Sequence, residues 1–242
     1  MDYLPIVGDR LRSGRNISEG YQRGCGLEFG NLREKIGADP DYVDAAEYCE
    51  GRSVVRVDRR MNLFLLVKFF LPRIARGHII EYGCYRGGSA LFLAALARKF
   101  LPGVQVYALD TFLGMPPTDV GVDAHSEGDF STTSFEELLQ ARSEYGLNNL
   151  HFVKGIFAET APQVLREAGR IALAHIDCDI YESVRYAYDS CKGHMIAQGY
   201  IVFDDSTSSS CLGATEAVER FVIRRDGLLS EQIFPHHVFR AP

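Results

Sequence analysis

The chain has 242 residues, of which 46% are hydrophobic and 24% are charged, a composition typical of globular proteins and unlike that of a disordered chain. This length suits one large α/β domain, which needs no disulfide or structural metal to fold. Acidic residues number 32 and basic residues 26, and the resulting net charge of −6 argues against a protein that binds nucleic acid through its phosphates.

Several sequence features favour a cytoplasmic location. Met1 is followed by Asp2 and scattered charges, without the apolar segment of a secretory signal. None of the six cysteines forms a CxxC pair, so we expect reduced thiols rather than disulfides or a zinc ribbon. The most apolar run, residues 61–72, is shorter than the ~20 residues that span a bilayer. We expect a core helix there rather than a membrane-surface helix, and no stable membrane insertion.

Residues 1–52 lack a clean hydrophobic period and contain many glycines. One short helix is expected over residues 41–50, after the turn signal Asp39-Pro40. We expect this segment to be an arm or lid that shapes the substrate pocket or contacts a second subunit of a homo-oligomer. Residues 53–242 are expected to form the main domain.

From residue 53 onward, helical patterns alternate with short apolar runs. The expected helices are residues 61–75, 89–100, 134–145, 162–168, 183–195 and 213–225. The expected strands are residues 78–83, 104–110, 151–154, 171–177 and 199–204, followed by a strand-like piece at 232–240. This alternation is typical of βαβ units and predicts an α/β fold with a mostly parallel central sheet and helices on both faces. Ligands should then bind at the carboxyl ends of the strands.

The first strand leads into a glycine turn and a helix, with the sequence EYGCYRGGS over residues 81–89. Glycines let the backbone pass close to a ligand, and a helix N-terminus offers free N–H groups. Gly83 and Gly87 are too far apart for the first two glycines of the dinucleotide motif GxGxxG. Glu81, beside the turn, would repel a pyrophosphate but suits the amino group or sulfonium of S-adenosylmethionine.

Asp110 ends the second strand. A carboxylate at this position can accept hydrogen bonds from both ribose hydroxyls of a nucleoside. We therefore expect Asp110, together with its neighbour Thr111, to bind the cofactor.

Paired acids follow the next two buried strands, as Asp177-Cys-Asp179 and Asp204-Asp205. Carboxylates this close repel one another unless protons or a cation intervene. All-oxygen ligation suits Mg²⁺, Mn²⁺ or Ca²⁺. If the strand geometry persists to Asp179, Asp177 and Asp179 project from the same side, so that both face the cleft.

At this point the sequence resembles the macrocin O-methyltransferase family, the metal-dependent sugar O-methyltransferases of antibiotic pathways. The resemblance covers about residues 54–224 and depends on six motifs in order: EYGCYRGGS (81–89), LDTFLGMP (109–116), EGDFSTTSFEEL (127–138), VKGIFAET (153–160), HIDCDIYES (175–183) and FDDSTSSSCLGATEAVERF (203–221). It implies a Rossmann-like class I methyltransferase fold, S-adenosylmethionine as methyl donor and Mg²⁺ (or Mn²⁺) as metal. The acceptor would be a small molecule or glycan, with a sugar or glycosylated natural product methylated on a hydroxyl.

The resemblance also implies roles for individual residues. The positions that match the family's metal ligands are Asp177, Asp204 and Asp205. The position that matches its proposed general base is Asp179. The matches to cofactor-binding positions are Glu81, Gly83 and Ser89 for the methionine end, Asp110 for the ribose, and Gly155, Ile156 and Phe157 for the adenine.

Two other functions compete with this one. A glycosyltransferase also uses Asp-x-Asp to hold a metal against a nucleotide diphosphate, but Glu81 and the lack of a basic cluster for pyrophosphate disfavour it. A non-catalytic cofactor-binding protein would have no reason to keep four repelling carboxylates. The acceptor itself depends on pocket shape, which sequence does not specify.

Overall fold

The computed structural model describes residues 32–242. Its centre is a seven-stranded sheet in the order β3-β2-β1-β4-β5-β7-β6, and β7 runs antiparallel to both of its neighbours. The strands are β1 (His78–Tyr82), β2 (Val106–Asp110), β3 (Leu150–Lys154), β4 (Ile171–Ile176), β5 (Met195–Phe203), β6 (Ser230–Gln232) and β7 (His237–Arg240). The predicted mostly parallel α/β sheet is confirmed.

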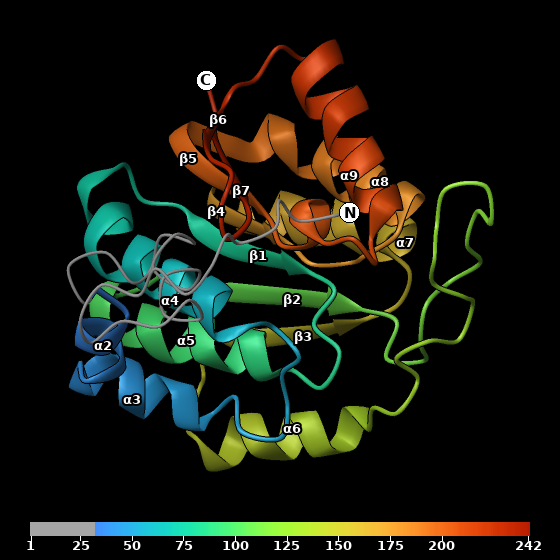
Figure 1. The fold of residues 1–242 in the computed structure, drawn as a ribbon. Helices are drawn as coiled ribbons and strands as arrows, with labels where there is room; N and C mark the ends of the chain where they lie inside the picture. The colour runs from blue at the N-terminus through green and yellow to red at the C-terminus, as the bar shows by residue number, and fades with distance from the viewer. Residues whose placement is uncertain (1–31) are drawn as a thin grey trace, which may run out of the picture.

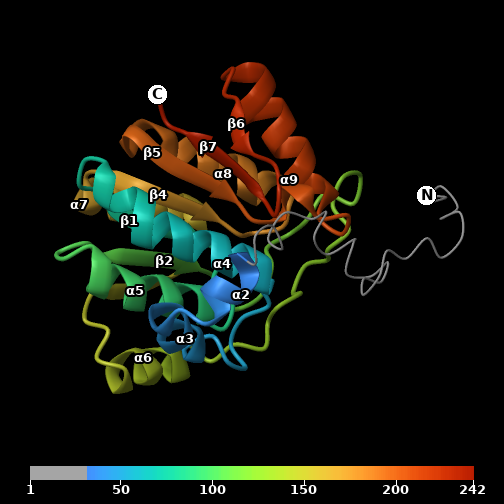
Figure 2. The same cartoon turned by 60° about the vertical axis from the view of Figure 1, so that its left-hand side comes forward.

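Helices cover both faces of this sheet, as Figures 1 and 2 show. The helices are α2 (Leu32–Gly37), α3 (Pro40–Glu47), α4 (Val57–Leu65), α5 (Gly88–Phe100), α6 (Phe135–Glu144), α7 (Phe157–Ala168), α8 (Tyr181–Cys191) and α9 (Leu212–Ala217). One face carries α4, α5 and α6, and the opposite face carries α7, α8 and α9. α4 continues into a π-helical turn, Leu66–Phe70, and α9 into a second one, Val218–Arg225.

Most expected elements are present, although some boundaries shift. α4 begins at Val57 instead of residue 61, and β5 begins at Met195, where an expected helix was to end. Two other elements differ more. α7 begins at Phe157 instead of Pro162, so the proline lies inside the helix. Proline usually starts a helix because it lacks an N–H, but α7 buries Val164 and Leu165 against the sheet, and this packing outweighs the local preference. The C-terminal piece at 232–240 is two strands, β6 and β7, rather than one.

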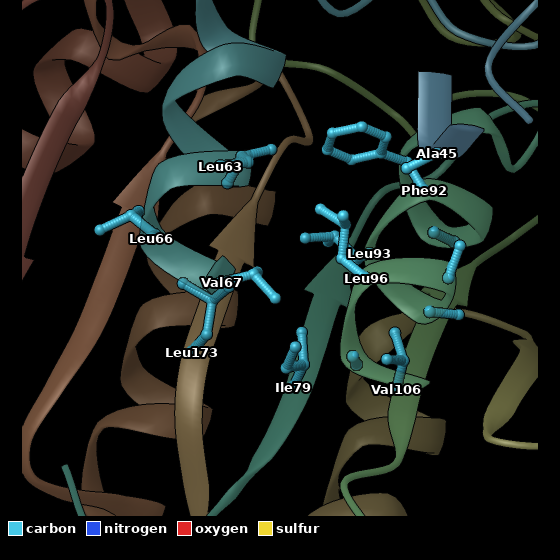
Figure 3. Close-up of a cluster of buried hydrophobic side chains, with 14 of the residues drawn as sticks. Ala45, Leu63, Leu66, Val67, Ile79, Phe92, Leu93, Leu96, Val106 and Leu173 are labelled. Atoms are coloured by element: carbon cyan, nitrogen blue, oxygen red, sulfur yellow. The ribbon is translucent and has the colours of Figure 1, made fainter. Parts of the chain in front are cut away.

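The core on the α4–α5 face is continuous, as Figure 3 shows. Leu63 and Val67, from the most apolar run of the sequence, are fully buried together with Ile79 of β1 and Leu96 of α5. This burial confirms a core helix over that run. Within residues 32–242, no helix is both long and apolar enough to cross a membrane.

Part of the predicted arm belongs to the same core. Tyr42 of α3 packs edge-on against Phe64 and Phe92, with ring centroids 5.4 and 6.0 Å apart. Asp39 caps α3 by accepting a hydrogen bond from the Asp41 backbone N–H, as its turn signal suggested. Residues 1–31 lie outside the described residues, so the role of the arm as a lid or subunit contact stays a prediction.

The turn after β1 touches the chain after β4. A Cβ placed on Gly83, whose φ is +82°, would lie 1.9 Å from the backbone oxygen of Asp177. We expect Gly83→Ala to lower the free energy of unfolding by about 3–5 kcal/mol, because a backbone clash adds to the cost of a positive φ. Urea unfolding of the purified variant measures this loss.

Gly103→Ala is the matched control for this substitution. Gly103 has a similar φ of +86°, but no atom of the described residues lies within 4 Å of its added Cβ. The expected loss there is only about 1–2 kcal/mol, the cost of the left-handed conformation alone. Equal losses at the two glycines would contradict the view that the Gly83 turn positions Asp177.

Candidate active site

A cavity of about 380 Å³ lies at the carboxyl ends of β1, β2, β4 and β5. The strand order reverses between β1 and β4, which is where sheets of this type bind ligands. The long connection between β2 and α6, residues 111–134, extends beyond the same edge of the sheet (Figure 1) and contributes Phe130 to the cavity wall.

Most of the predicted site residues meet at this cavity. Those in its wall are Gly83, Ser89, Asp110, Thr111, Ile156, Phe157, Asp177, Asp179, Asp204 and Asp205. Glu81 and Gly155 are not part of the wall. The binding and catalytic roles assigned to all twelve residues stay predictions.

Asp110 connects the glycine turn to the end of β2. Its Oδ2 atom accepts hydrogen bonds from the backbone N–H groups of Cys84 and Tyr85, each at 2.9 Å. Its Oδ1 atom accepts another from the backbone N–H of Phe112 at 2.8 Å. The carboxylate is thus held rigidly at the cavity wall, and Oδ1 keeps acceptor capacity for a ligand hydroxyl.

The turn between β3 and α7 forms a neighbouring apolar wall. Ile156 is 44% exposed at the cavity, and Phe157 packs edge-on against Tyr82 at 5.1 Å. The backbone N–H of Gly155 donates to the Asp110 carbonyl oxygen at 2.9 Å, which places this wall next to the Asp110 carboxylate. An apolar surface beside a hydroxyl-binding acid suits a nucleoside, with the base on the apolar side chains.

Glu81 lies behind the glycine turn rather than at the cavity. Its side chain is fully buried, and Oε1 lies 2.8 Å from Nδ1 of His175. Its Oε2 atom has no hydrogen-bond partner among residues 32–242. The sequence prediction paired Glu81 with a cofactor amino group, whereas in the structure its contact is with His175.

The three predicted metal ligands converge. One oxygen each of Asp177, Asp204 and Asp205 lies within 4.8 Å of the others. Burial and repulsion from Asp204 raise the pKa values of both Asp177 and Asp205. Oδ2 of Asp205 is buried without a hydrogen-bond partner in the described part of the chain. An unpartnered oxygen within three crowded carboxylates fits a divalent cation such as Mg²⁺.

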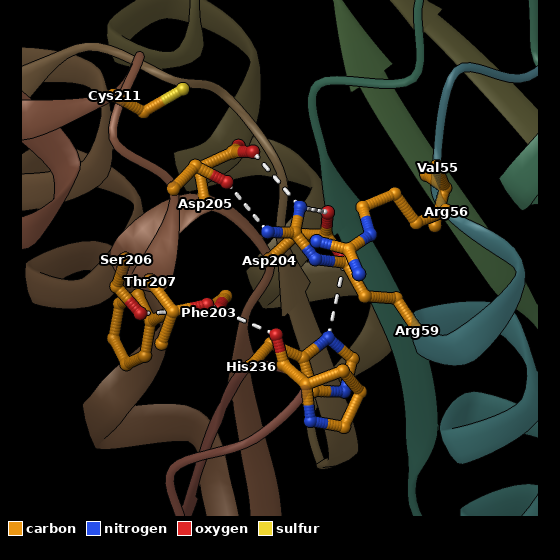
Figure 4. A network of polar contacts seen from close by, with 12 residues as sticks. Val55, Arg56, Arg59, Phe203, Asp204, Asp205, Ser206, Thr207, Cys211 and His236 are labelled. Atoms are coloured by element: carbon orange, nitrogen blue, oxygen red, sulfur yellow. Dashed lines mark hydrogen bonds and ion pairs between the residues drawn. The ribbon is translucent and has the colours of Figure 1, made fainter. Parts of the chain in front are cut away.

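Arg59 of α4 reaches the same acids (Figure 4). Its Nη1 lies 2.6 Å from Oδ2 of Asp204 and 3.4 Å from Oδ1 of Asp205. Its Nη2 donates to Ser208 Oγ at 2.5 Å. The guanidinium is nearly buried, so it provides a fixed positive charge beside the acid cluster.

Two buried histidines contact the other oxygen of Asp204. Oδ1 lies 3.2 Å from Nδ1 of His236 and 3.4 Å from Nε2 of His175. Burial opposes ionisation of Asp204, but hydrogen bonds from the two histidines hold its pKa well below its usual value. Burial also opposes a charge on His175, yet hydrogen bonds with Asp204 and Glu81 raise its pKa to about 9. Asp204 is thus the most completely partnered of the three acids.

Sequence patterns do not identify Arg59 or His236 as part of this network. His236 has no carboxylate at ligand spacing nearby in the sequence, and Asp204 is 32 positions away. Arg59 and Asp204 are 145 positions apart. The only local signal is that Arg59 lies among the basic residues just before the apolar run 61–72. His175 lies inside the apolar strand β4 and is fully buried there.

The strand geometry does not continue to Asp179, so the condition for Asp177 and Asp179 to project from the same side is not met. β4 ends at Ile176, and Asp179 has a φ of +58°. The Ile180 N–H donates to the Cys178 carbonyl at 2.6 Å and closes a tight turn around Asp179. The Asp179 carboxylate still lines the cavity, because the turn aims it there. Burial, with repulsion from Asp205, raises its pKa to about 8.

Comparison with known proteins supports the resemblance. The family model described as macrocin O-methyltransferase (TylF) matches residues 52–231. A tetracenomycin 4'-O-methyltransferase of Streptomyces olivaceus, which acts on 8-demethyl-8-(2,3-dimethoxy-alpha-L-rhamnosyl)-tetracenomycin-C, is 28% identical over 189 residues, 73% of this chain and 71% of that protein. Mycinamicin III 3''-O-methyltransferase of Micromonospora griseorubida is 25% identical over 181 residues, 70% and 69% of the two chains.

Solved structures share the fold. The O-methyltransferase NovP superposes with a TM-score of 0.68 at 20% identity, covering 78% of this chain and 81% of NovP. The calicheamicin methyltransferase CalS11 gives a TM-score of 0.62 at 19% identity, covering 84% and 93%. The expected Rossmann-like class I methyltransferase fold is therefore confirmed. Because the family model matches most of the sequence, the chain belongs to the macrocin O-methyltransferase family.

Proposed function

We propose that the protein is an S-adenosylmethionine-dependent and divalent-metal-dependent O-methyltransferase that acts on a hydroxyl of a sugar or glycosylated natural product. The observation that carries this proposal is a single cavity with a nucleoside-type site at one end and buried acids at the other. The nucleoside-type site consists of Asp110 and the apolar wall at Ile156 and Phe157. The acid cluster consists of Asp177, Asp204 and Asp205.

The acceptor class comes from the relatives. The names of the two curated relatives describe methylation of the 4' position of a rhamnosyl-bearing tetracenomycin and of the 3'' position of mycinamicin III. CalS11 is described as a TDP-rhamnose 3'-O-methyltransferase. A sugar hydroxyl is the shared feature, and we extend it to this chain as the acceptor.

The residues at the acidic end suit deprotonation of such a hydroxyl. Asp177, Asp204 and Asp205 would hold Mg²⁺ (or Mn²⁺), which when bound lowers the pKa of an acceptor oxygen. Asp179 lines the same cavity and would accept the hydroxyl proton. The glycine turn and Asp110 would fix the methyl donor so that acceptor oxygen, methyl carbon and sulfur lie in line.

A direct test measures transfer of a labelled methyl group from S-adenosylmethionine to a panel of acceptors. The panel contains a nucleoside-diphosphate rhamnose, a rhamnosylated aglycone and the same aglycone without sugar, each with and without Mg²⁺. We expect label only on the sugar-bearing acceptors. Transfer to the sugar-free aglycone would contradict the acceptor class, and no detectable binding of S-adenosylhomocysteine by calorimetry would contradict the methyltransferase activity itself.

Asp110→Asn tests the cofactor end. We expect it to weaken S-adenosylhomocysteine binding by roughly 1.5–3 kcal/mol, or about 10- to 150-fold, because the ribose hydroxyls lose a charged acceptor. Calorimetry with S-adenosylhomocysteine and its 2',3'-dideoxy analogue measures this. The wild type should discriminate between the two ligands and the variant should not. Glu167→Gln, an exposed acid at the end of α7, is the control that should bind like wild type.

The analogue separates ligand contact from loop support, since Asp110 also holds the glycine turn. If Asp110→Asn weakens both ligands equally and still discriminates between them, Asp110 supports the turn without touching the ribose. Unchanged affinity for S-adenosylhomocysteine would rule out both roles.

A further inference from the structure

We propose that His125, Asp179 and Cys211 form a second metal site, beside the acid cluster and suited to Zn²⁺. Ligand atoms of these three side chains lie within 4.8 Å of one another. They come from three separate segments: the connection between β2 and α6, the turn after β4, and the residue before α9. The inhibition of methyl transfer described below rests on the role proposed for Asp179 as the base. Binding of the ion itself does not depend on that role.

The distances between the three ligand atoms are close to those of zinc coordination. Sγ of Cys211 lies 3.3 Å from Oδ1 of Asp179 and 3.8 Å from Nε2 of His125. Nε2 of His125 lies 3.9 Å from Oδ1 of Asp179. In a tetrahedral zinc site with bonds of about 2.0–2.3 Å, ligand atoms are roughly 3.3–3.6 Å apart. Shifts of a few tenths of an ångström would place all three atoms around one ion.

A further contact orients His125 as a ligand. Its Nδ1 atom lies 3.3 Å from Oδ2 of Asp129, on the opposite side of the ring from Cys211 and Asp179. The Asp129 carboxylate also accepts a hydrogen bond from the Ser126 backbone N–H. This bond, and secondly the bond from His125, lower the pKa of Asp129. The ionised Asp129 carboxylate is therefore the acceptor of the hydrogen bond from His125. A carboxylate that accepts from Nδ1–H leaves the lone pair on Nε2, as in most histidine–zinc sites.

The aromatic ring of Phe130 also packs against His125. The two rings are 5.6 Å apart between centroids. Asp129 and Phe130 therefore hold the imidazole from two sides, and its Nε2 atom stays directed at Cys211 and Asp179.

The two metal sites differ in donor chemistry. The acid cluster offers only oxygen, which suits Mg²⁺. The second cluster offers one sulfur, one nitrogen and one oxygen, a set that selects Zn²⁺ or Co²⁺ over Mg²⁺. Three protein ligands leave a fourth position, and because Asp179 lines the cavity, that position can face it.

Occupancy of this site would inhibit methyl transfer. An ion on the Asp179 carboxylate withdraws the electron pair that would accept the acceptor's proton. It would also tie residues 111–134, which contribute Phe130 to the cavity wall, to the start of α9. We therefore expect Zn²⁺ to inhibit in saturating Mg²⁺, and excess Mg²⁺ not to relieve the inhibition.

Co²⁺ is the probe for binding, because thiolate–Co²⁺ bonds give a charge-transfer absorption band in the near ultraviolet. Titration of the full chain with Co²⁺ in saturating Mg²⁺ should give this band with one equivalent, and Zn²⁺ should displace it. A Cys25→Ser background removes the thiol that lies outside the described residues. Cys211→Ser should abolish the band, while Cys191→Ala, which removes a buried thiol of α8, should leave it.

Three further variants locate the ion. His125→Asn should weaken Co²⁺ binding at least 100-fold, and Asp129→Asn by about 10- to 100-fold because it only orients the imidazole. His194→Asn, at a half-buried histidine that is not part of the cavity wall, should bind Co²⁺ like wild type. Asp177→Asn should impair Mg²⁺ binding but leave the thiolate band, since it belongs to the other site.

A missing band in the wild-type chain, or a band that survives Cys211→Ser, would overturn the proposal. So would Zn²⁺ inhibition that excess Mg²⁺ relieves, because the inhibiting ion would then occupy the acid cluster. The Co²⁺ titration needs no methyl transfer. Failure of this site is therefore distinguishable from failure of the proposed function, which the acceptor panel and S-adenosylhomocysteine binding test.

Discussion

Asp179→Asn should lower kcat by about 10²- to 10⁴-fold, the usual loss when a general base is removed. Asparagine keeps the shape of the side chain and also tolerates the left-handed backbone that Asp179 adopts, so the turn before α8 should survive. Affinities for S-adenosylhomocysteine and Mg²⁺ should stay near wild type. Steady-state kinetics with the best acceptor of the panel, together with calorimetry for both ligands, measure the effect.

Glu182→Gln is the control for Asp179→Asn. Glu182 is another acid of the cavity wall, but it pairs with Arg185 at 2.6 Å and contacts no member of the acid cluster among the described residues. Its kcat should stay within a few-fold of wild type. Full activity of Asp179→Asn would mean that hydroxyl activation needs no protein base. Loss of Mg²⁺ from Asp179→Asn with retention by Asp177→Asn would show that the two roles are exchanged.

Removal of divalent metal by EDTA should abolish methyl transfer, and Mg²⁺ or Mn²⁺ should restore it. Asp177→Asn and Asp205→Asn should each weaken Mg²⁺ binding at least 100-fold, measured by calorimetry, because each removes a charged oxygen ligand. Asp204 is a poorer test, since its carboxylate also binds Arg59, His175 and His236. Loss of Asp204 would remove the shorter of two carboxylate contacts from buried Arg59 and the acceptor of His236, and would destabilise the fold.

Full activity in the presence of EDTA would contradict the metal requirement. Arg59 would then be the cation that faces the acceptor, because its guanidinium already contacts Asp204 and Asp205. Arg59→Lys distinguishes these outcomes. In a metal-dependent enzyme it should keep its Mg²⁺ response, whereas in a metal-independent one it should lose activity with or without Mg²⁺.

Local sequence patterns predict the fold and much of the cavity wall. Apolar runs that alternate with helical periods specify the parallel sheet, and the carboxyl ends of its strands place Gly83, Asp110, Asp177 and Asp204 at one edge. Each of those residues ends a strand or follows one directly, so its position depends only on where that strand ends. Asp110 is the clearest example, since it is both the last residue of β2 and the acceptor for the glycine turn.

Contacts between distant side chains could not be predicted in the same way. Arg59 and His236 reach Asp204 from α4 and from the start of β7, and no periodicity or spacing relates such segments. The left-handed backbone of Asp179 results from a turn imposed between β4 and α8, where strand geometry was assumed. The His125–Cys211 contact depends on the path of a long connection, which composition does not specify.

The ion pair between Arg59 and the two acids also bears on how the protein can be handled. A buried carboxylate cluster without a counter-ion would favour unfolding when metal is withdrawn. Here a guanidinium from the protein's own chain lies 2.6 Å from Asp204 and supplies compensating charge. Removal of the metal by a chelator should therefore yield a folded apoprotein that can be stored, dialysed and reconstituted. Metal and cofactor can then be added to it in either order.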